Sequence, residues 1–202
     1  MNLTVIPLTS EKKDGKFRFF DELKRILNKN KFKIKNGDVI VISSKFVSNS
    51  QGRILNIDKS KVCEKASKIS KKFKSNEKFM EIVYRESDEI VGGVAGFVMS
   101  TTNGILAPNA GIDKSNSKGT KIILYPNEPY RFAEEIKRKI FLELNLHVGV
   151  IIVDSRLMPA RIGTTGVAIA CAGIKPTKDL RGEKDLDGNP LKVTFQATAD
   201  NL

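Results

Sequence analysis

The longest apolar run in the chain extends from Val148 to Val153, and the acidic residue Asp154 follows it directly. The run is strand-sized and has no polar position, which is typical of a strand buried on both faces of a sheet. It is also far too short to cross a membrane as a helix. This run therefore predicts an interior strand with a carboxylate at its end.

The rest of the chain predicts helices and strands in a mixed α/β arrangement. Apolar spacing predicts helices over Phe17–Leu27, Val62–Phe73, Lys78–Arg85 and Pro129–Leu144. Short apolar runs predict strands over Leu3–Leu8, Val39–Ile42, Phe97–Ser100, Ile105–Ala107, Ile122–Leu124, Val167–Ile174 and Leu191–Phe195. Asn103-Gly104 is a strong hairpin signal. Strict βαβ alternation fails in the second half, so we do not expect a Rossmann or doubly wound sheet.

Several common catalytic motifs are absent. The chain has neither the glycine-rich P-loop sequence nor the dinucleotide fingerprint, so we do not expect a P-loop fold. The single histidine, His147, excludes most zinc sites and a Ser-His-Asp triad, and we expect it to be structural or at the surface. Cys63 and Cys171 are far apart and are expected to be free thiols. With no signal peptide at the N-terminus, we expect a cytoplasmic protein without a membrane partner.

The net charge of +12 is unevenly distributed along the chain. Up to Lys78 there are 20 Lys and Arg against 8 Asp and Glu, and beyond it there are 15 of each. Such a basic part attracts nucleic acid or an anionic ligand, or it is a solvated lysine-rich surface. Lysines outnumber arginines 26 to 9, and no aromatic residues interleave with them in a single-strand-binding pattern, so we do not expect a nucleic-acid partner.

The first candidate site is the segment Ala107–Asn116, which follows a predicted strand. It combines proline, glycine, asparagine, aspartate and serine within ten residues, and a plain turn is one interpretation of that composition. The alternative is a metal site at Asp113, because carboxylate, amide and hydroxyl oxygens suit Mg²⁺ or Mn²⁺. The residues alone leave both interpretations open.

The second candidate site extends from Asp154 to Gly166. A carboxylate at the C-terminal end of a buried strand is a usual place for a metal ligand or a catalytic acid in α/β proteins. Arg156 and Arg161 have the planar geometry that binds phosphate or carboxylate bidentately, and the glycines let backbone N–H groups approach an anion. A helix cap at Asp154 with surface arginines is the plainer alternative.

Two further segments are weaker candidates. Ser43-Ser44-Lys45 and the polar stretch from Ser48 to Arg53 follow a predicted strand, where hydroxyls and a lysine can bind phosphate. A capped loop explains them equally well. The charged segment Lys178–Gly182 is expected to be a surface loop.

Taken together, these segments resemble the coenzyme F420-0:L-glutamate ligase family, the γ-glutamyl ligases of F420 biosynthesis. The matching pieces occur in the order of the family and cover nearly the whole chain: Ile6–Leu8, Gly37–Val41, Arg85–Ser87, Asn109–Asn116, Val148–Ser155, Gly166–Ile169 and Asp179–Gly182. The segments N-A-G-I-D-K-S-N and V-G-V-I-I-V-D-S are highly specific in combination.

The resemblance implies a GTP-dependent ligase with the unusual mixed α/β fold of the family. It would add L-glutamate through its amine to a carboxylate of F420-0, and then of F420-1, by way of an acyl phosphate. The expected partners are GTP, L-glutamate, F420-0 and a second copy of the chain in a homodimer. We expect one domain over residues 1–202, lacking a C-terminal segment that carries further nucleotide and metal contacts in the family.

The resemblance also implies roles for particular residues. The metal ligands, for Mg²⁺ or Mn²⁺, would be Asp113, Asp154 and Ser155. The nucleotide would contact Ile6, Pro7, Leu8, Thr9, Ser44, Lys45, Asn49 and Asn116. The catalytic candidates are Asp113, Asp154 and Arg161.

The chain departs from the family pattern at two places. The family usually has Ser-Lys-Ala-Glu-Gly-Arg where this chain has Ser48-Asn49-Ser50-Gln51-Gly52-Arg53, so Asn49 stands in place of the expected nucleotide-contacting lysine unless Lys45 reaches in. After Ser155 the family more often has Gly-Arg-Pro. These departures leave open whether the nucleotide is GTP or ATP, and which molecule is the acceptor. The alternatives are an amide ligase for another acceptor, a non-catalytic protein that binds nucleotide or F420, and, on charge alone, a nucleic-acid-binding protein.

Overall fold

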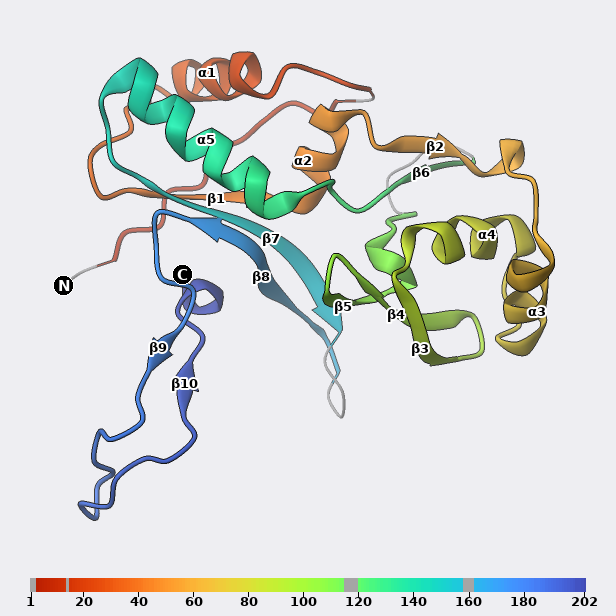
Figure 1. Cartoon of the computed structure of the whole chain (residues 1–202). Coiled ribbons are helices and arrows are strands. Elements are labelled where there is room, and N and C mark those ends of the chain that lie inside the picture. Colours follow the sequence, from red (N-terminus) through yellow and green to blue (C-terminus); the bar gives the residue numbers. More distant parts are fainter. Residues whose placement is uncertain (1–2, 14, 115–119, 158–161) are drawn as a thin grey trace. The chain divides into compact units, whose positions relative to one another are not determined.

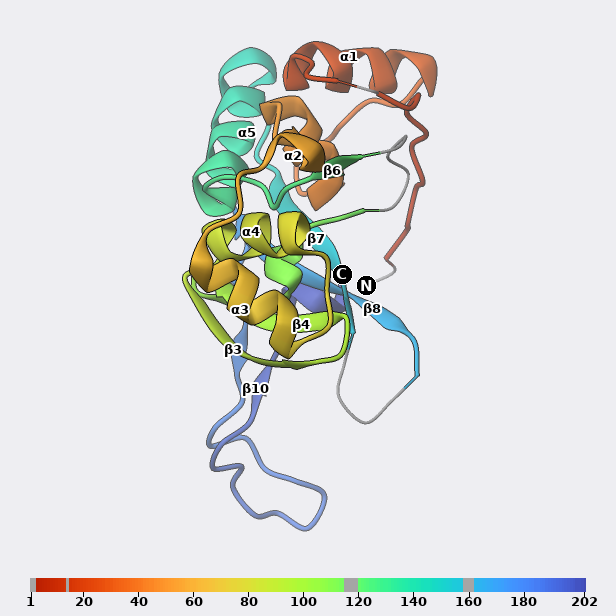
Figure 2. The same cartoon turned by 90° about the vertical axis from the view of Figure 1, so that its right-hand side faces the viewer.

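The computed structural model describes residues 3–13, 15–114, 120–157 and 162–202 (Figures 1 and 2). Its α-helices are α1 (Phe19–Lys29), α2 (Ser44–Gln51), α3 (Glu64–Lys72), α4 (Glu77–Glu86) and α5 (Pro129–Leu144). Its strands are β1 (Val39–Ser43), β2 (Ile54–Asn56), β3 (Glu89–Val94), β4 (Phe97–Thr102), β5 (Ile105–Pro108), β6 (Lys121–Ile123), β7 (Gly149–Leu157), β8 (Thr164–Ala172), β9 (Lys178–Asp179) and β10 (Phe195–Gln196). Short 3₁₀ helices are η1 (Ile57–Lys59), η2 (Asn109–Gly111) and η3 (Ala199–Asn201). The predicted mixed α/β class is confirmed.

The chain forms two compact units. Unit 1 comprises Met1–Ile34 and Ser44–Asn127, and unit 2 comprises Lys35–Ser43 and Glu128–Leu202. Each unit has its own sheet and its own buried apolar side chains. The expected single domain over residues 1–202 stays a prediction.

Unit 2 is built on the three-stranded sheet β1-β7-β8. The central strand β7 pairs in parallel with β1 and antiparallel with β8, and helix α5 packs on β7 and β8 (Figure 1). Val150, Ile151 and Ile152 are fully buried because they are covered on both faces of the sheet. The predicted interior strand is therefore confirmed, although it extends to Leu157.

Unit 1 contains the antiparallel sheet β3-β4-β5 and the helix pair α3 and α4. The hairpin between β4 and β5 turns at Asn103 and Gly104, whose φ angles of 51° and 70° are those that a two-residue hairpin turn requires. That prediction is confirmed. Apolar side chains of α4 form the core with residues from the strands and from the segment after β5. The core residues are Phe73, Phe79, Met80, Ile82, Val83, Val98, Ala110, Ile112, Ile122 and Leu124.

Helix α2 of unit 1 is a correction to the sequence analysis, which allowed a capped loop at this serine-rich segment. The helix begins at Ser44 and is anchored by Phe46, whose ring centroid lies 4.8 Å from that of Phe17 and 5.7 Å from that of Phe19 in α1. Serine and asparagine are poor helix formers in isolation. Tertiary packing, which includes Phe46 and the fully buried Val47, therefore favours the helical conformation here.

Two predicted strands are wrong. Residues 3–8 form no strand, and Leu3, Val5 and Ile6 are largely exposed because no described strand pairs with them. The strand predicted over Leu191–Phe195 is reduced to β10, which pairs only with the equally short β9. None of the described helices combines the length and the apolar character needed to span a membrane.

Candidate functional site

The turn that follows β5 has an unusual backbone. Asn109, Ala110 and Gly111 have consecutive positive φ angles of 48°, 57° and 67°. The left-handed region is unfavourable for residues with a Cβ, and a run of such residues persists only where the surrounding structure holds it. A Cβ at position 111 would also overlap the ring of Tyr125, so glycine is required there.

Buried hydrogen bonds hold this turn in place. The hydroxyl of Ser100 accepts the N–H of Ala110 at 3.0 Å and donates to the carbonyl of Ala107 at 3.1 Å. The side-chain oxygen of Asn109 accepts the N–H of Val98 at 3.0 Å. Ser100 and Ala110 are fully buried, so the turn belongs to the core. The segment is therefore a turn, as its composition indicates, and this turn is packed into the core.

The turn delivers Asp113 to a defined position. The backbone of Asp113 exchanges two hydrogen bonds with Ile123, at 2.8 and 3.0 Å. The Asp113 side chain is 30% exposed and forms an ion pair with the ammonium group of Lys45 from α2. Two predicted site residues that lie 68 positions apart in the sequence are therefore brought together in unit 1.

The next residue, Lys114, has a different environment from Lys45. Its ammonium nitrogen lies 3.2 Å from the centroid of the Phe79 ring, and burial lowers the pKa of Lys114. A cation over an aromatic face in a partly dry environment is a packing interaction that stabilises the segment. Lys114 therefore ties the loop to α4 at the residue that follows Asp113.

The face of α2 that carries Lys45 also carries two buried polar atoms. Residues three and four positions apart are neighbours on a helix, so Ser48 and Asn49 lie beside Lys45. The hydroxyl of Ser48 and the side-chain oxygen of Asn49 are buried, and neither has a hydrogen-bond partner among the described residues. Ser44, the other predicted nucleotide contact in α2, is buried at the start of the helix.

In unit 2, Asp154 lies where the parallel pairing of β7 ends. The last residue of β1, Ser43, pairs with Val153, whereas β7 continues beyond this point in its hairpin with β8. The alternative of a helix cap at Asp154 is wrong because the residue is within a strand. The Asp154 carboxylate lies 3.3 Å from Nε of Arg156, whose side chain is only 6% exposed. Arg156 is therefore a buried partner of Asp154 and not a surface arginine.

Ser155 follows Asp154 within the same strand and is exposed. Successive side chains of a strand point to opposite faces, so the hydroxyl of Ser155 is directed away from the Asp154 carboxylate. A metal bound by Asp154 would lie on the face of the strand that also carries Arg156. Ser155, on the other face, would bind a different ligand atom or a different ion.

The remaining predicted residues fall into two groups. Ile6, Pro7, Leu8 and Thr9 form an extended segment in unit 1 that is tied to the end of α1, where the side chain of Asn30 donates to the carbonyl of Thr9 at 3.2 Å. Asn116 and Arg161 lie outside the described residues. Asp113 belongs to unit 1 and Asp154 to unit 2, so each carboxylate is described within its own unit.

Both carboxylates suit a divalent metal. Asp113 is partly exposed and already paired with a cation, and Asp154 faces a guanidinium at the end of a parallel strand pair. Hard carboxylate oxygens at such places are the ligands that Mg²⁺ and Mn²⁺ prefer. Within the described part of the chain, no group of three or more carboxylate, imidazole or thiol side chains is clustered for metal binding.

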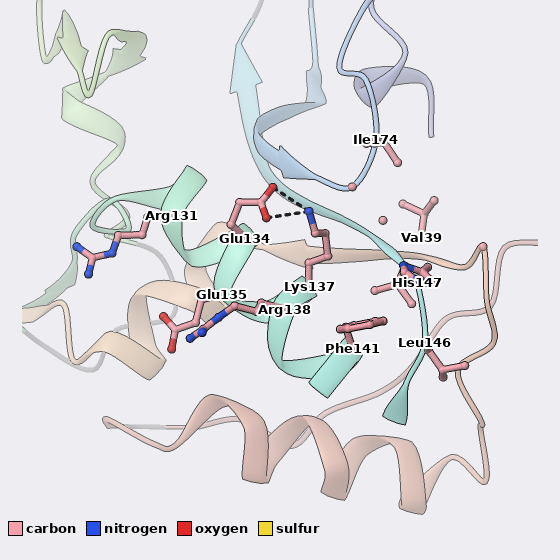
Figure 3. A pocket seen from close by; sticks show the side chains of 14 residues that line it. Val39, Arg131, Glu134, Glu135, Lys137, Arg138, Phe141, Leu146, His147 and Ile174 are labelled. Atoms are coloured by element: carbon pink, nitrogen blue, oxygen red, sulfur yellow. Dashed lines mark hydrogen bonds and ion pairs between the residues drawn. The ribbon is translucent and has the colours of Figure 1, made fainter. Parts of the chain in front are cut away.

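Unit 2 has a pocket of about 1050 Å³ beside α5 (Figure 3). It lies at the beginning of β1 and β7, and its lining includes Arg138, Phe141 and His147. The rings of Phe141 and His147 are 4.9 Å apart, and Glu134 pairs with Lys137 at 2.9 Å. None of the site residues that the structure describes lines this pocket, which is at the opposite end of β7 from Asp154.

Comparison with known proteins agrees with the resemblance seen in the sequence. The family model described as F420-0:Gamma-glutamyl ligase matches residues 13–202. The coenzyme F420:L-glutamate ligase of Methanocaldococcus jannaschii is 38% identical over 173 residues, which cover 85% of this chain and 69% of the relative. The proteins of the same name from Archaeoglobus fulgidus and Methanopyrus kandleri are each 32% identical, over 90% and 84% of this chain and 73% and 68% of the relatives.

Proposed function

This chain belongs to the F420-0:gamma-glutamyl ligase family, a family of ligases, and from that membership we propose that it joins L-glutamate to F420-0 with GTP as the phosphoryl donor. The observation that carries the proposal is the Lys45–Asp113 pair on the turn of Asn109–Asp113. That turn is one of the two most specific segments of the resemblance. Its buried hydrogen bonds hold the segment that carries Asp113, which pairs with Lys45. A phosphoryl-transfer site needs both charges.

The proposed reaction has two steps. A carboxylate oxygen of the acceptor attacks the γ-phosphorus of GTP, the bond to the β-phosphate oxygen breaks, and GDP leaves. The amine of L-glutamate then attacks the carbonyl carbon of the acyl phosphate. Inorganic phosphate leaves, the amine loses a proton, and an amide bond remains. Neither step requires a histidine, since positioning and charge stabilisation carry most of the catalysis of such transfers.

Within this scheme Asp113 and Asp154 are ligands of divalent metal, Mg²⁺ or Mn²⁺, each within its own unit, and Ser155 is a ligand of a second ion. A bound metal neutralises charge that builds up on the transferred phosphoryl group. Lys45, Ser44 and the segment Ile6–Thr9 bind the nucleotide, together with Asn49 and Asn116. Arg161 is proposed to stabilise the transition state through its guanidinium.

Other features implied by the family belong to the same proposal. We infer a homodimer in the cytoplasm, and repeated addition of glutamate to F420-1. An amide ligase for a different acceptor is the second candidate, which the two departures from the family pattern together allow. The two candidates share the site and differ in the acceptor.

The test is a turnover assay of the full chain with F420-0, L-glutamate and Mg²⁺ or Mn²⁺, with GTP and ATP in parallel. Mass spectrometry should find a product heavier than F420-0 by one glutamyl residue, formed together with one GDP and one phosphate. Product from another acceptor and none from F420-0 supports the second candidate. Nucleotide binding without any product contradicts both candidates and favours a non-catalytic binding protein.

Two substitutions test the metal assignment. Asp113→Asn and Asp154→Asn should each lower kcat by roughly 10²–10³-fold, because charge stabilisation in the transition state depends on these carboxylates. The matched control is Asp21→Asn, which removes an exposed carboxylate of α1 that pairs with the exposed Arg18. Full activity of both site variants would contradict the assignment, provided that circular dichroism shows an unchanged fold for all three.

A further inference from the structure

Helix α2 has one cationic side chain, Lys45, and its ammonium group already forms an ion pair. The sequence of the helix is Ser-Lys-Phe-Val-Ser-Asn-Ser-Gln, and the ammonium group of Lys45 pairs with the carboxylate of Asp113. Both side chains are 30% exposed, so solvent screens the pair only in part. The charge of Lys45 is therefore largely neutralised by Asp113, and a phosphate at this face gains little attraction from it.

Asn49 does not supply the missing charge. It lies one helical turn after Lys45, on the same face of α2, and its side chain is neutral. Its buried oxygen and the buried hydroxyl of Ser48 have no hydrogen-bond partner among the described residues. Buried polar atoms are normally paired, so these two atoms have hydrogen-bonding capacity that none of the described residues uses.

We propose that Lys45 binds the nucleotide phosphates only when a divalent metal at Asp113 releases it from that carboxylate. Because Asn49 is neutral, this release is necessary for α2 to present a cation to the phosphates. A divalent cation at Asp113 takes over the neutralisation of that carboxylate, and Lys45 then turns to the nucleotide phosphates. Without the metal, Lys45 stays with Asp113, and α2 itself has no second cationic residue for a phosphate. This inference rests on the proposed function, because it assumes that nucleotide binds at the α2 face.

The proposal makes a prediction that a simple metal site does not make. If Asp113 only binds metal, Asp113→Asn weakens nucleotide binding whenever metal is present and changes little in its absence. If Asp113 also restrains Lys45, Asp113→Asn frees the lysine. Nucleotide affinity in the absence of metal then increases.

The experiment measures binding of a fluorescent N-methylanthraniloyl-GDP to the full chain by anisotropy, at constant ionic strength, in EDTA and in Mg²⁺. The wild-type chain should bind in Mg²⁺ and at least about tenfold more weakly in EDTA, which corresponds to about 1.4 kcal/mol. In EDTA, Asp113→Asn should tighten binding about tenfold. Inorganic pyrophosphate should compete with the probe, since the phosphates are the group recognised.

A double-variant cycle separates release of Lys45 from simple loss of negative charge. The gain of Asp113→Asn in EDTA should disappear when Lys45→Gln is added, because the freed lysine carries it. Asn49→Lys should also raise affinity in EDTA, with Asn49→Gln as the neutral control of similar length. A gain of Asp113→Asn that persists with Lys45→Gln overturns the proposal.

The outcomes distinguish this inference from the proposed function. Binding in Mg²⁺ with no gain for Asp113→Asn in EDTA overturns the release of Lys45 and leaves the nucleotide site intact. An unchanged probe affinity for Lys45→Gln in Mg²⁺ overturns any role of Lys45 at the phosphates. Absence of probe binding under every condition overturns both the inference and the nucleotide site proposed at α2.

Discussion

At the scale of single residues, Gly111 determines the geometry of the turn that carries Asp113. Its φ of 67° is in the left-handed region, and a side chain there would overlap the ring of Tyr125. Tyr125 is itself almost fully buried, so it has little room to move. A glycine at this position therefore satisfies a conformational requirement and a packing requirement together.

Gly111→Ala should destabilise the protein by about 2–4 kcal/mol, from overpacking against Tyr125 and from the left-handed backbone. The matched control is Gly104→Ala, since Gly104 has a similar φ of 70° and no atom within 4 Å of the added methyl group. That control should cost only about 1–2 kcal/mol. Chemical denaturation measures both, and equal losses would mean that the Tyr125 ring yields without cost.

At the scale of elements, a buried carboxylate joins helices α3 and α4. Glu81 of α4 is 1% exposed and accepts the backbone N–H of Cys63 at 2.7 Å. Cys63 is the N-cap residue of α3, and Arg85 also pairs with Glu81. The hydrogen bond from Cys63 and, less strongly, the interaction with Arg85 lower the pKa of Glu81. The carboxylate form therefore stabilises the start of α3.

This arrangement predicts how stability changes in acid. Because the pKa of Glu81 is lower in the folded state than its ordinary value of 4.5, the ion adds stability above that pH. The contribution is lost as the pH falls below 4.5 toward the folded pKa. Urea unfolding between about pH 5 and about pH 3 should therefore show a steeper loss for the wild-type chain than for Glu81→Gln.

The control for that series is Glu89→Gln, which changes an exposed carboxylate of β3 in the same unit. Its pH profile should follow that of the wild-type chain. Parallel profiles for wild type and Glu81→Gln would show that the buried carboxylate contributes nothing to the acid sensitivity.

At the scale of the whole molecule, the two units differ strongly in charge. Unit 1 has 23 Lys and Arg against 12 Asp and Glu, and unit 2 has 12 against 11. Unit 1 therefore accounts for +11 of the net charge of +12. Such a surface attracts anions over about a Debye length of 10 Å at moderate ionic strength. The proposed acceptor F420-0, which has a phosphodiester and the carboxylate that receives glutamate, is an anion of this kind.

Raising the ionic strength from about 0.05 M to about 0.5 M should weaken acceptor binding roughly tenfold, because long-range attraction to unit 1 is screened. Titration calorimetry with F420-0 at several KCl concentrations measures the effect. Substituting glutamine for the exposed lysines Lys65, Lys68 and Lys72 of α3 shows whether the attraction is general or local. An affinity that does not change with salt concentration would contradict a contribution of the basic surface to acceptor binding.

Elements with strong local signals could be predicted from the sequence. Helix α5 was predicted with the observed bounds, Pro129–Leu144, because a proline in its first turn and a regular apolar stripe specify a helix locally. The β4–β5 hairpin followed from Asn103 and Gly104 for the same reason. The strand over residues 3–8 and the polar helix α2 were not predicted correctly, since pairing and packing partners decide those segments.

For the candidate site, sequence patterns determined which residues are candidates: a carboxylate after an interior strand and a second one in a turn-rich segment, neither of them accompanied by a histidine. Only the tertiary structure decided that Asp113 pairs with Lys45, that Asp154 lies within β7 beside the buried Arg156, and that Asn109 and Ala110 are left-handed. Local patterns record conformational preferences over a few residues. Ion pairs and strained turns depend on contacts between distant segments, which form only when the core closes around them.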